Sequence, residues 1–335
     1  MATSPTIAID AMGGDHGPSV TVPATLAALA QYPDLKLLLI GDLAQIKSAA
    51  GRDLTHYSTR LILRHAPCVI EMDAKPSHIL KECAATSMGL TLDAVRSGEA
   101  DAAVSGGNTG ALMVLSRHLL GMSPGISRPA ICAPIPSRRG SVYLLDVGAN
   151  VDSPPQHLQQ FAHLGSSLAT LLGRGEPRVA LLNIGHEHGK GNEQVKSSDQ
   201  LLKNDNTINY IGFIEAGGLL RGDADVVVCD GFVGNITLKS MEATSQYVAE
   251  TLRAEFDRSA WRRILGFLVK PTIKRMKQGV DTDRYNGALF LGLKGLVLKS
   301  HGDASSASFE SAISQARLCL AQNIISHMTQ GDSSI

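Results

Sequence analysis

Residues 101–113 read Asp-Ala-Ala-Val-Ser-Gly-Gly-Asn-Thr-Gly-Ala-Leu-Met, and they place a strand, a glycine turn and a helix start in immediate succession. The apolar run 102–104 is typical of a short buried strand. Residues 105–107, Ser-Gly-Gly, end that strand, and Asn108 or Thr109 can cap the helix that follows. This order is typical of a strand and helix in an α/β fold.

The backbone N–H groups of this turn surround one point at the positive end of a helix dipole. Such an arrangement binds anions, phosphate above all. The alternative is an ordinary connection in which glycine serves only to turn the chain, because glycine turns before helices are common in α/β folds. The candidate ligand-binding residues of the turn are Ser105, Gly106, Gly107, Asn108, Thr109 and Gly110.

Three other stretches repeat parts of this design. Residues 224–237 run from Ala-Asp through an apolar strand and glycines to Asn and a helical stretch, and the strands in 144–150 and 180–185 end in similar polar turns. Because loops at the carboxyl ends of parallel strands line one crevice, we expect a polar pocket with little side-chain bulk. The polar residues that these stretches bring to it are Asn150, Asn183, Asp230 and Asn235.

The composition narrows the class of protein. A chain of 335 residues can form one large α/β domain or two interleaved ones. Apolar residues make up 44% and aromatic residues 4%, a balance typical of parallel-sheet proteins. Lys plus Arg and Asp plus Glu number 31 each, so no overall charge favours nucleic acid or a membrane. Any electrostatic attraction must therefore be local.

Cysteine usage and the N-terminus favour a cytoplasmic protein. The five cysteines are scattered and include no Cys-x-x-Cys pair, which fits reduced thiols and neither disulfides nor a zinc site. Residues 1–5 lack the pattern of a signal peptide. No run of about 18 apolar residues is available to span a bilayer.

Strands and helices alternate along the whole sequence, which predicts a three-layer α/β/α architecture with a mostly parallel sheet. The apolar segments 130–135 and 141–145 predict a hairpin, with two arginines in the tip at 137–140. No boundary has the composition of a linker, so residues 1–328 are expected to form a single compact unit. Residues 329–335 are expected to be a disordered tail.

A second glycine loop, residues 10–18, follows the first predicted strand. Its Asp10, Asp15 and His16 could all reach a ligand, and Gly13 and Gly14 leave room for one. A metal is the less favoured reading, because one histidine among acidic residues more often forms a hydrogen-bond network.

The loop at residues 185–193 presents Lys190 between glycines, though without the spacing of a phosphate-binding Walker motif. We interpret it as a lysine offered to an anion. The alternative is a metal held by His186 and His188, which is a weak signal in a glycine-rich loop.

Residues 258–277 form a basic amphipathic segment with seven Lys/Arg and no acidic residue, and they hold the only tryptophan. Such a segment can lie in a membrane interface, where each basic residue near anionic lipid contributes about 1 kcal/mol. A dimer interface or a helix packed on the core is the alternative. The residues expected to contact the membrane are Trp261, Leu265, Phe267 and Leu268.

Taken in order, six motifs resemble those of the bacterial phosphate acyltransferases, the PlsX family. The resemblance covers about residues 6–325, and one departure is the His186–His188 segment, where the family usually has acidic residues. The motifs are Asp10-Ala-Met-Gly-Gly-Asp-His16, Ser105-Gly-Gly-Asn-Thr-Gly-Ala-Leu112, Leu144-Leu-Asp-Val-Gly-Ala-Asn150, Leu181-Leu-Asn-Ile-Gly185 with Gly189-Lys-Gly-Asn192, Val226-Val-Val-Cys-Asp-Gly-Phe-Val-Gly-Asn235 and Lys299-Ser-His-Gly302.

The resemblance implies a fold like that of phosphotransacetylases and of isocitrate and isopropylmalate dehydrogenases, and normally a homodimer. It implies transfer of a fatty acyl group from acyl carrier protein to inorganic phosphate. The acyl phosphate would then serve a membrane glycerol-3-phosphate acyltransferase of the PlsY type. Peripheral association with the inner face of the cell membrane agrees with this, and the reaction needs no cofactor or metal.

The expected roles follow from that chemistry. Asn108 and the turn around it would hold phosphate, with Lys190 neutralising charge. Asn183 and Asn235 would orient the thioester or its oxyanion. His16 or His301 would exchange a proton, oriented by Asp10 or Asp230.

Three other functions compete with this reading. A nicotinamide-dependent dehydrogenase is disfavoured, because no Gly-x-Gly-x-x-Gly follows an early strand. A short-chain phosphotransacetylase would accept acetyl-coenzyme A. A membrane-associated scaffold would bind acyl carrier protein without turnover.

Overall fold

The computed structural model describes residues 4–51, 53–74, 79–80, 83–187, 189–259, 261–262, 286–325 and 327. The strands are β1 (Thr6–Asp10), β2 (Lys36–Gly41), β3 (Leu61–His65), β4 (Ala102–Ser105), β5 (Ala130–Ser137), β6 (Gly140–Leu145), β7 (Arg178–Leu182), β8 (Asn209–Ile214), β9 (Val226–Val228), β10 (Ala288–Leu291) and β11 (Leu296–Lys299).

The α-helices are α1 (Pro18–Gln31), α2 (Leu43–Ala50), α4 (Ser87–Arg96), α5 (Thr109–Leu120), α6 (Pro155–Leu171), α7 (Glu193–Lys203), α8 (Ala216–Arg221), α9 (Gly231–Asp257) and α11 (Ser306–Ala321). Strands and helices alternate as the sequence predicts, and β5 and β6 form the expected hairpin.

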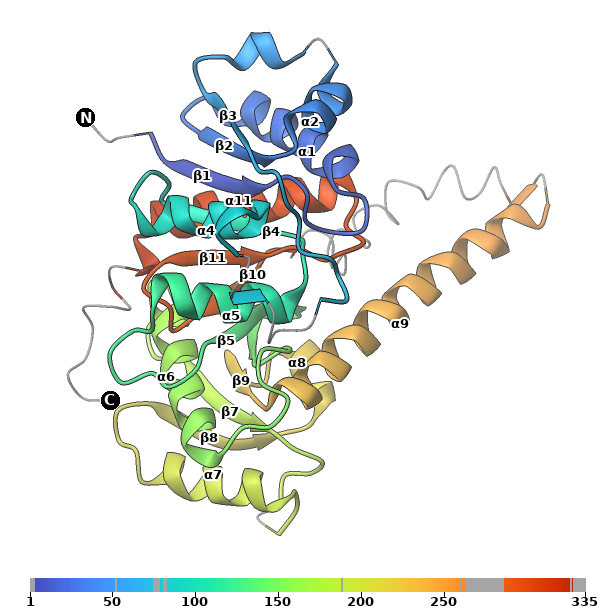
Figure 1. Ribbon diagram of the computed structural model, residues 1–335. Helices are drawn as coiled ribbons and strands as arrows, with labels where there is room; N and C mark the ends of the chain where they lie inside the picture. Colours follow the sequence, from blue (N-terminus) through green and yellow to red (C-terminus); the bar gives the residue numbers. More distant parts are fainter. Residues whose placement is uncertain are drawn as a thin grey trace.

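The strands form one sheet in the order β3-β2-β1-β4-β11-β10-β5-β6-β9-β7-β8 (Figure 1). Most neighbours are parallel, but β10 pairs antiparallel with both β11 and β5, and β5 pairs antiparallel with β6. The strands β6, β9, β7 and β8 therefore run opposite to β1, β4, β11 and β5. The predicted site loops therefore follow strands of both directions, so the premise that these strands are all parallel is wrong, and their convergence on one pocket stays a prediction.

Helices cover both faces of the sheet, which confirms the three-layer α/β/α fold. One core contains Ile7, Ile9 and Leu37 of the first strands with Phe161 of α6 and Phe309 of α11. The other core contains residues of β5, β6, β10 and β11 with α4, α5 and α8, and Leu238 and Met241 of α9 pack against it.

Capping residues at the strand-to-helix turns explain where several helices begin. Asn108 caps α5 and accepts a hydrogen bond from the Ala111 N–H at 2.9 Å. Asp230 caps α9 in the same way, with the Val233 N–H at 2.8 Å. Each cap satisfies a backbone donor that a helix start leaves free. Of the two candidate caps of α5, the structure selects Asn108.

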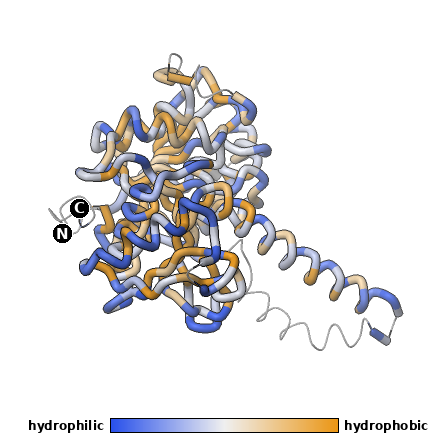
Figure 2. Tube along the Cα trace, turned by 90° about the horizontal axis from the view of Figure 1, so that it is seen from below, coloured by the Kyte–Doolittle hydropathy of each residue, from blue (hydrophilic) through white to orange (hydrophobic). Residues whose placement is uncertain are grey.

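Helix α9 extends far from the body of the molecule (Figures 1 and 2). None of the described helices combines the length and the apolar character that a bilayer crossing requires. Trp261 is 67% exposed just beyond α9. The other three residues expected to contact the membrane, Leu265, Phe267 and Leu268, lie outside the described residues, as does the tail 329–335.

Candidate active site

A buried chain of two hydrogen bonds joins the ends of β1 and β4. Asp10 is 1% exposed, and its Oδ2 accepts a hydrogen bond from the Ser105 hydroxyl at 2.7 Å. The Ser105 Oγ in turn accepts one from the Gly107 N–H at 3.1 Å. Burial raises the pKa of Asp10, and hydrogen bonds from Ser87 and Ser105 act in the opposite direction. Asp10 therefore organises the glycine turn from inside the protein.

Glycines let three loops meet backbone to backbone. A Cβ on Gly13 would lie 2.7 Å from Asp10 Oδ2 and 2.8 Å from the Gly107 nitrogen. Gly14 has a φ of +93°, and a Cβ there would lie 2.9 Å from the Gly302 carbonyl oxygen. Any side chain at these two positions would force apart the ends of β1, β4 and β11.

Asn108 fixes the start of α5 from both sides. Besides the cap, its Nδ2 donates a hydrogen bond to the Met72 carbonyl oxygen. Thr109 and Gly110 form the first turn of the helix and are half-buried. The backbone donors of this turn lie next to the three packed loops.

Lys299, the last residue of β11, is a contributor that our sequence reasoning did not place in the site. Its Nζ donates a hydrogen bond to the Gly106 carbonyl oxygen at 3.1 Å and another to the Ser300 carbonyl oxygen. Burial and then the positive charge of Lys239 lower the pKa of Lys299 to about 8. The sequence feature that could have indicated this role is a lysine directly after the apolar run 296–298.

His301 connects this cluster to α9. Its Nε2 lies 3.3 Å from Glu242 Oε1, and its backbone N–H donates to Asn286 Oδ1 at 3.1 Å. Burial lowers the pKa of His301, Glu242 opposes the shift, and the charge of Lys239 adds to it. Lys239 itself lies 3.8 Å from Glu242. Helix α9 therefore brings one cation and one carboxylate to the end of β11.

His16 lies on the same loop as Gly13 and Gly14, and its side chain is exposed. Its carbonyl oxygen accepts a hydrogen bond from the Ser19 hydroxyl at 2.7 Å. His16 thus sits beside the cluster, with its imidazole open to solvent.

The ends of β6 and β9 form a second cluster. Asp146 accepts hydrogen bonds from the Asn150 N–H at 2.7 Å and from Asn150 Nδ2 at 2.9 Å, while the Asn150 carbonyl accepts the Gly231 N–H at 2.7 Å. A Cβ on Gly148 would lie 3.7 Å from the Asn235 carboxamide carbon. Asn150 is buried, Asp230 is half-buried at the start of α9, and Asn235 is exposed beside them.

The loop after β7 completes this second group. Asn183 accepts a hydrogen bond from the Ile184 N–H at 2.9 Å, and its Nδ2 donates to the Lys190 carbonyl at 3.3 Å. The side chain of Lys190 is exposed. The Nδ1 of His186 lies 3.0 Å from the Phe213 carbonyl oxygen.

The predicted residues thus fall into two groups. The first, at the ends of β1, β4 and β11, contains Asp10, Gly13, Gly14, Ser105, Gly106, Gly107, Asn108, Thr109, Gly110 and His301. The second, at the ends of β6, β7 and β9, contains Asn150, Asn183, Lys190, Asp230 and Asn235. Helix α9 contacts both groups, because it begins at Gly231 and reaches His301 with Glu242.

The fold and this glycine-lined cluster define the class of protein. The chain has the fold of phosphotransacetylases: the enzyme from Streptococcus pyogenes matches with a TM-score of 0.59 and 16% identity over 96% of this chain and 95% of that one. A branched-chain phosphotransacylase from Enterococcus faecalis matches with a TM-score of 0.58 and 15% identity over 96% and 99%.

Sequence comparison is more specific. A family model described as "Fatty acid synthesis protein" matches residues 5–327. A phosphate acyltransferase of Alkalilimnicola ehrlichii is 48% identical over 319 residues, which cover 95% of this chain and 93% of the relative. The chain belongs to the phosphate acyltransferases of the PlsX family, enzymes of fatty acid and phospholipid synthesis.

Proposed function

We propose that this enzyme transfers a long-chain fatty acyl group from acyl carrier protein to inorganic phosphate, and that the acyl phosphate serves phospholipid synthesis. A phosphate oxygen attacks the thioester carbonyl carbon, the C–S bond breaks, and the thiolate of the carrier leaves and takes up a proton. A thiol with a pKa of about 8.5 can leave as its thiolate without strong acid assistance. The protein must mainly hold the dianion beside the carbonyl and stabilise the oxyanion.

The observation that carries this proposal is the meeting of three strand ends at the start of α5. Glycines there bring backbone groups together without side-chain bulk, and a helix start offers N–H donors to an anion. Asn108, Thr109 and Gly110 would hold phosphate. Lys299 donates a hydrogen bond to the Gly106 carbonyl oxygen, and this contact offsets the negative partial charge of an oxygen that would otherwise repel an anion.

The proton taken up by the leaving thiolate would come from His301 or, as an alternative, from His16. His301 has the better support, because Glu242 lies against its imidazole and Asn286 holds its backbone N–H. Burial lowers the pKa of His301 and so favours the neutral imidazole, which would relay a proton from phosphate to the thiolate.

The second group of residues would receive the thioester. Asn183 and Asn235 carry amide donors that can orient a carbonyl, and Lys190 adds an exposed positive charge. Asn150 and Asp230 support the loop and the helix start from which Asn235 projects. Helix α9 would then connect the thioester side of the site to the phosphate side.

The direct test incubates purified protein with long-chain acyl-acyl carrier protein, with and without phosphate, and detects acyl phosphate by mass spectrometry. We expect acyl phosphate only when phosphate is present. A parallel reaction with acetyl-coenzyme A distinguishes a short-chain phosphotransacetylase. Release of free fatty acid at the same rate without phosphate would contradict the proposal.

We further propose that α9 is covered by a second copy of this chain in a homodimer. Of its 27 residues, only Gly231 and Gly234 are buried. Figure 2 shows hydrophobic residues along the projecting helix. Its large exposed apolar side chains are Phe232, Val233, Ile236, Tyr247 and Val248. A helix with this much exposed apolar surface usually has a partner.

The oligomeric state tests this. The pair Tyr247→Glu and Val248→Glu should shift the molar mass in light scattering from dimer to monomer, whereas Arg253→Glu on the same helix should not. An unchanged dimer in the first variant would refute the role of α9.

Membrane association remains a proposal based on the sequence of 258–277. Such a surface would deliver the amphiphilic product to the PlsY-type membrane acyltransferase. Changing Leu265, Phe267 and Leu268 to glutamate should abolish sedimentation with anionic liposomes, and unchanged sedimentation would contradict the idea.

A further inference from the structure

The tip of the β5–β6 hairpin carries an arginine cluster that the candidate active site does not use. Arg138 and Arg139 are exposed at the tip. Three other arginines surround it on neighbouring elements: Arg174, Arg178 and Arg221. Together with Glu176, Asp223 and Asp225 these residues leave a surplus of two positive charges in a chain whose net charge is zero.

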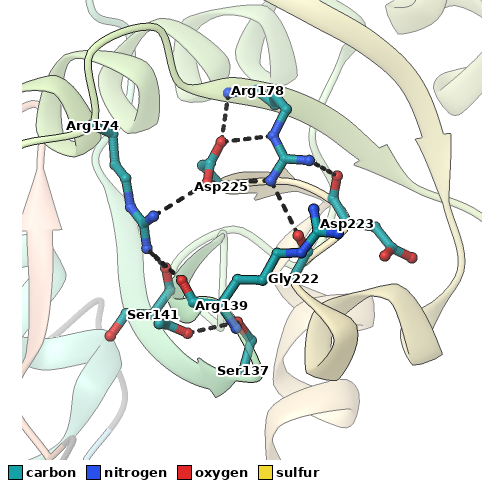
Figure 3. A network of polar contacts seen from close by, with 9 residues as sticks. Ser137, Arg139, Ser141, Arg174, Arg178, Gly222, Asp223 and Asp225 are labelled. Atoms are coloured by element: carbon teal, nitrogen blue, oxygen red, sulfur yellow. Dashed lines mark hydrogen bonds and ion pairs between the residues drawn. The ribbon is translucent and has the colours of Figure 1, made fainter.

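The acidic residues of the cluster are already paired. Asp225 binds Arg178 at 3.0 Å and lies 3.8 Å from Arg174, and Asp223 binds Arg221 at 2.7 Å. Figure 3 shows the contacts of Asp225 with Arg174 and Arg178 beside the hairpin. Within the part of the chain that the structure describes, no carboxylate forms an ion pair with Arg138 or Arg139. Their charges are available to a partner.

The tip is held rigidly. Arg174 donates hydrogen bonds to the carbonyl oxygens of Arg139 and Ser141 at 3.2 and 3.3 Å (Figure 3). The Arg138 N–H donates to the Leu220 carbonyl of α8 at 3.0 Å, and the Ser137 hydroxyl closes the turn onto Gly140 at 2.6 Å. A preorganised surface loses little conformational entropy when it binds.

The tip also lies at the same end of the sheet as the proposed phosphate site. Strand β5 runs parallel to β11, so both strands terminate at that end. Lys299 of β11 pairs with Ala288 of β10. The register between β10 and β5 places Ala133 of β5 opposite the same residue. Two strand spacings and the rise from Ala133 to Ser137 then separate Lys299 from the tip by about 17 Å. A flexible thioester arm can bridge such a distance.

We propose that Arg138 and Arg139 form the docking surface for the acidic face of the acyl-carrier partner, next to the phosphodiester of its pantetheine arm. The inference rests on the proposed function, because it concerns the donor of that reaction. Arginine suits this role, since its guanidinium binds carboxylates and phosphates through paired hydrogen bonds. Uncompensated arginines in an otherwise neutral chain also speed the encounter with an acidic partner.

The test is the double charge reversal Arg138→Glu with Arg139→Glu. Its matched control is the double variant Arg117→Glu with Arg128→Glu. Both arginines are exposed and lie at the opposite end of the sheet, Arg117 in the last turn of α5 and Arg128 just before β5. Both proteins are assayed with hexadecanoyl-acyl carrier protein and with the hexadecanoyl thioester of free pantetheine. Calorimetric titration with carrier protein that bears pantetheine but no acyl group gives Kd directly.

The hairpin variant should raise KM for the acyl carrier protein and the Kd of the carrier about tenfold or more. Turnover of the pantetheine thioester should not change, and the control should match the wild type. Raised salt should weaken carrier binding to the wild type more than to the hairpin variant.

An unchanged Kd in the hairpin variant, or equal losses with both thioesters, would overturn the docking surface. If the wild type forms no acyl phosphate at all, the proposed function fails, while the titration still decides whether this surface binds the carrier.

Discussion

The Nζ of Lys299 donates a hydrogen bond over 3.1 Å to the carbonyl oxygen of Gly106, which lies 193 residues earlier in the chain. The contact ties the end of β11 to the glycine turn before α5. It fixes the orientation of the peptide between Gly106 and Gly107, whose N–H donates to Ser105. A positive charge thus holds the turn in the shape that the proposed phosphate site requires.

Replacing Lys299 by methionine should therefore reduce kcat/KM for phosphate by about 100-fold, since a small misplacement of a binding loop has effects of that size. Methionine keeps much of the apolar stem, so the melting temperature should change little. Steady-state kinetics with varied phosphate measure the effect. Wild-type kinetics in a well-folded Lys299→Met protein would rule out this role.

The pH profile provides an independent check on the same residue. Burial lowers the pKa of Lys299 to about 8, so its ammonium is present below that pH and lost above it. Activity should fall as pH rises through about 8. In Lys299→Arg the guanidinium stays charged, and any remaining activity should lack this decline. The same alkaline decline in that variant would assign the titration to another group.

The sequence predicts the local structure around residues 105–110 well, because the forces that determine it are local. A glycine turn and an asparagine one residue before the helix determine where α5 begins, and the cap at Asn108 confirms it. Strand direction is different, because it depends on which distant segments pair. Nothing near residues 288–291 reveals that β10 inserts antiparallel between β11 and β5. The contacts of Lys299 and the approach of Glu242 to His301 also link distant segments, and the sequence pattern did not indicate them.

Asn108 has a structural and a proposed functional role that two substitutions can separate. Asn108→Ala removes the cap and should cost about 1 kcal/mol of stability as well as activity. Asn108→Asp can keep the cap but adds a negative charge where phosphate would bind, so it should raise KM for phosphate at near-normal stability. Chemical denaturation and kinetics measure the two effects. Normal phosphate kinetics in both variants would refute the assignment.

Gly13 tests whether the close meeting of the loops matters. Alanine there would place its Cβ 2.7 Å from Asp10 Oδ2 and 2.8 Å from the Gly107 nitrogen. The ends of β1 and β4 must then separate, and we expect turnover to fall by about 100-fold. Gly175→Ala is the control, because a Cβ at Gly175 meets no atom within 4 Å. Equal activity of the two variants would show that the packing is dispensable.

Acid stability should depend on Asp205. Burial alone would raise its pKa, but hydrogen bonds from Thr207 and Gln159 and the charge of His163 lower it from 3.8 to about 2. A carboxylate whose pKa is lowered by folding stabilises the folded state at pH values above its pKa in the unfolded chain. This contribution is lost as the pH falls from about 4 to 2. The shift corresponds to about 2 kcal/mol.

Asp205→Asn should therefore lower the free energy of unfolding at pH 7 and flatten its dependence on pH between 4 and 2. Urea denaturation across this range measures both changes. Asp152→Asn is the comparison, since Asp152 is exposed in the loop before α6, and it should keep the wild-type slope. If Asp205→Asn also kept that slope, the hydrogen bonds to Asp205 would not be a source of acid sensitivity.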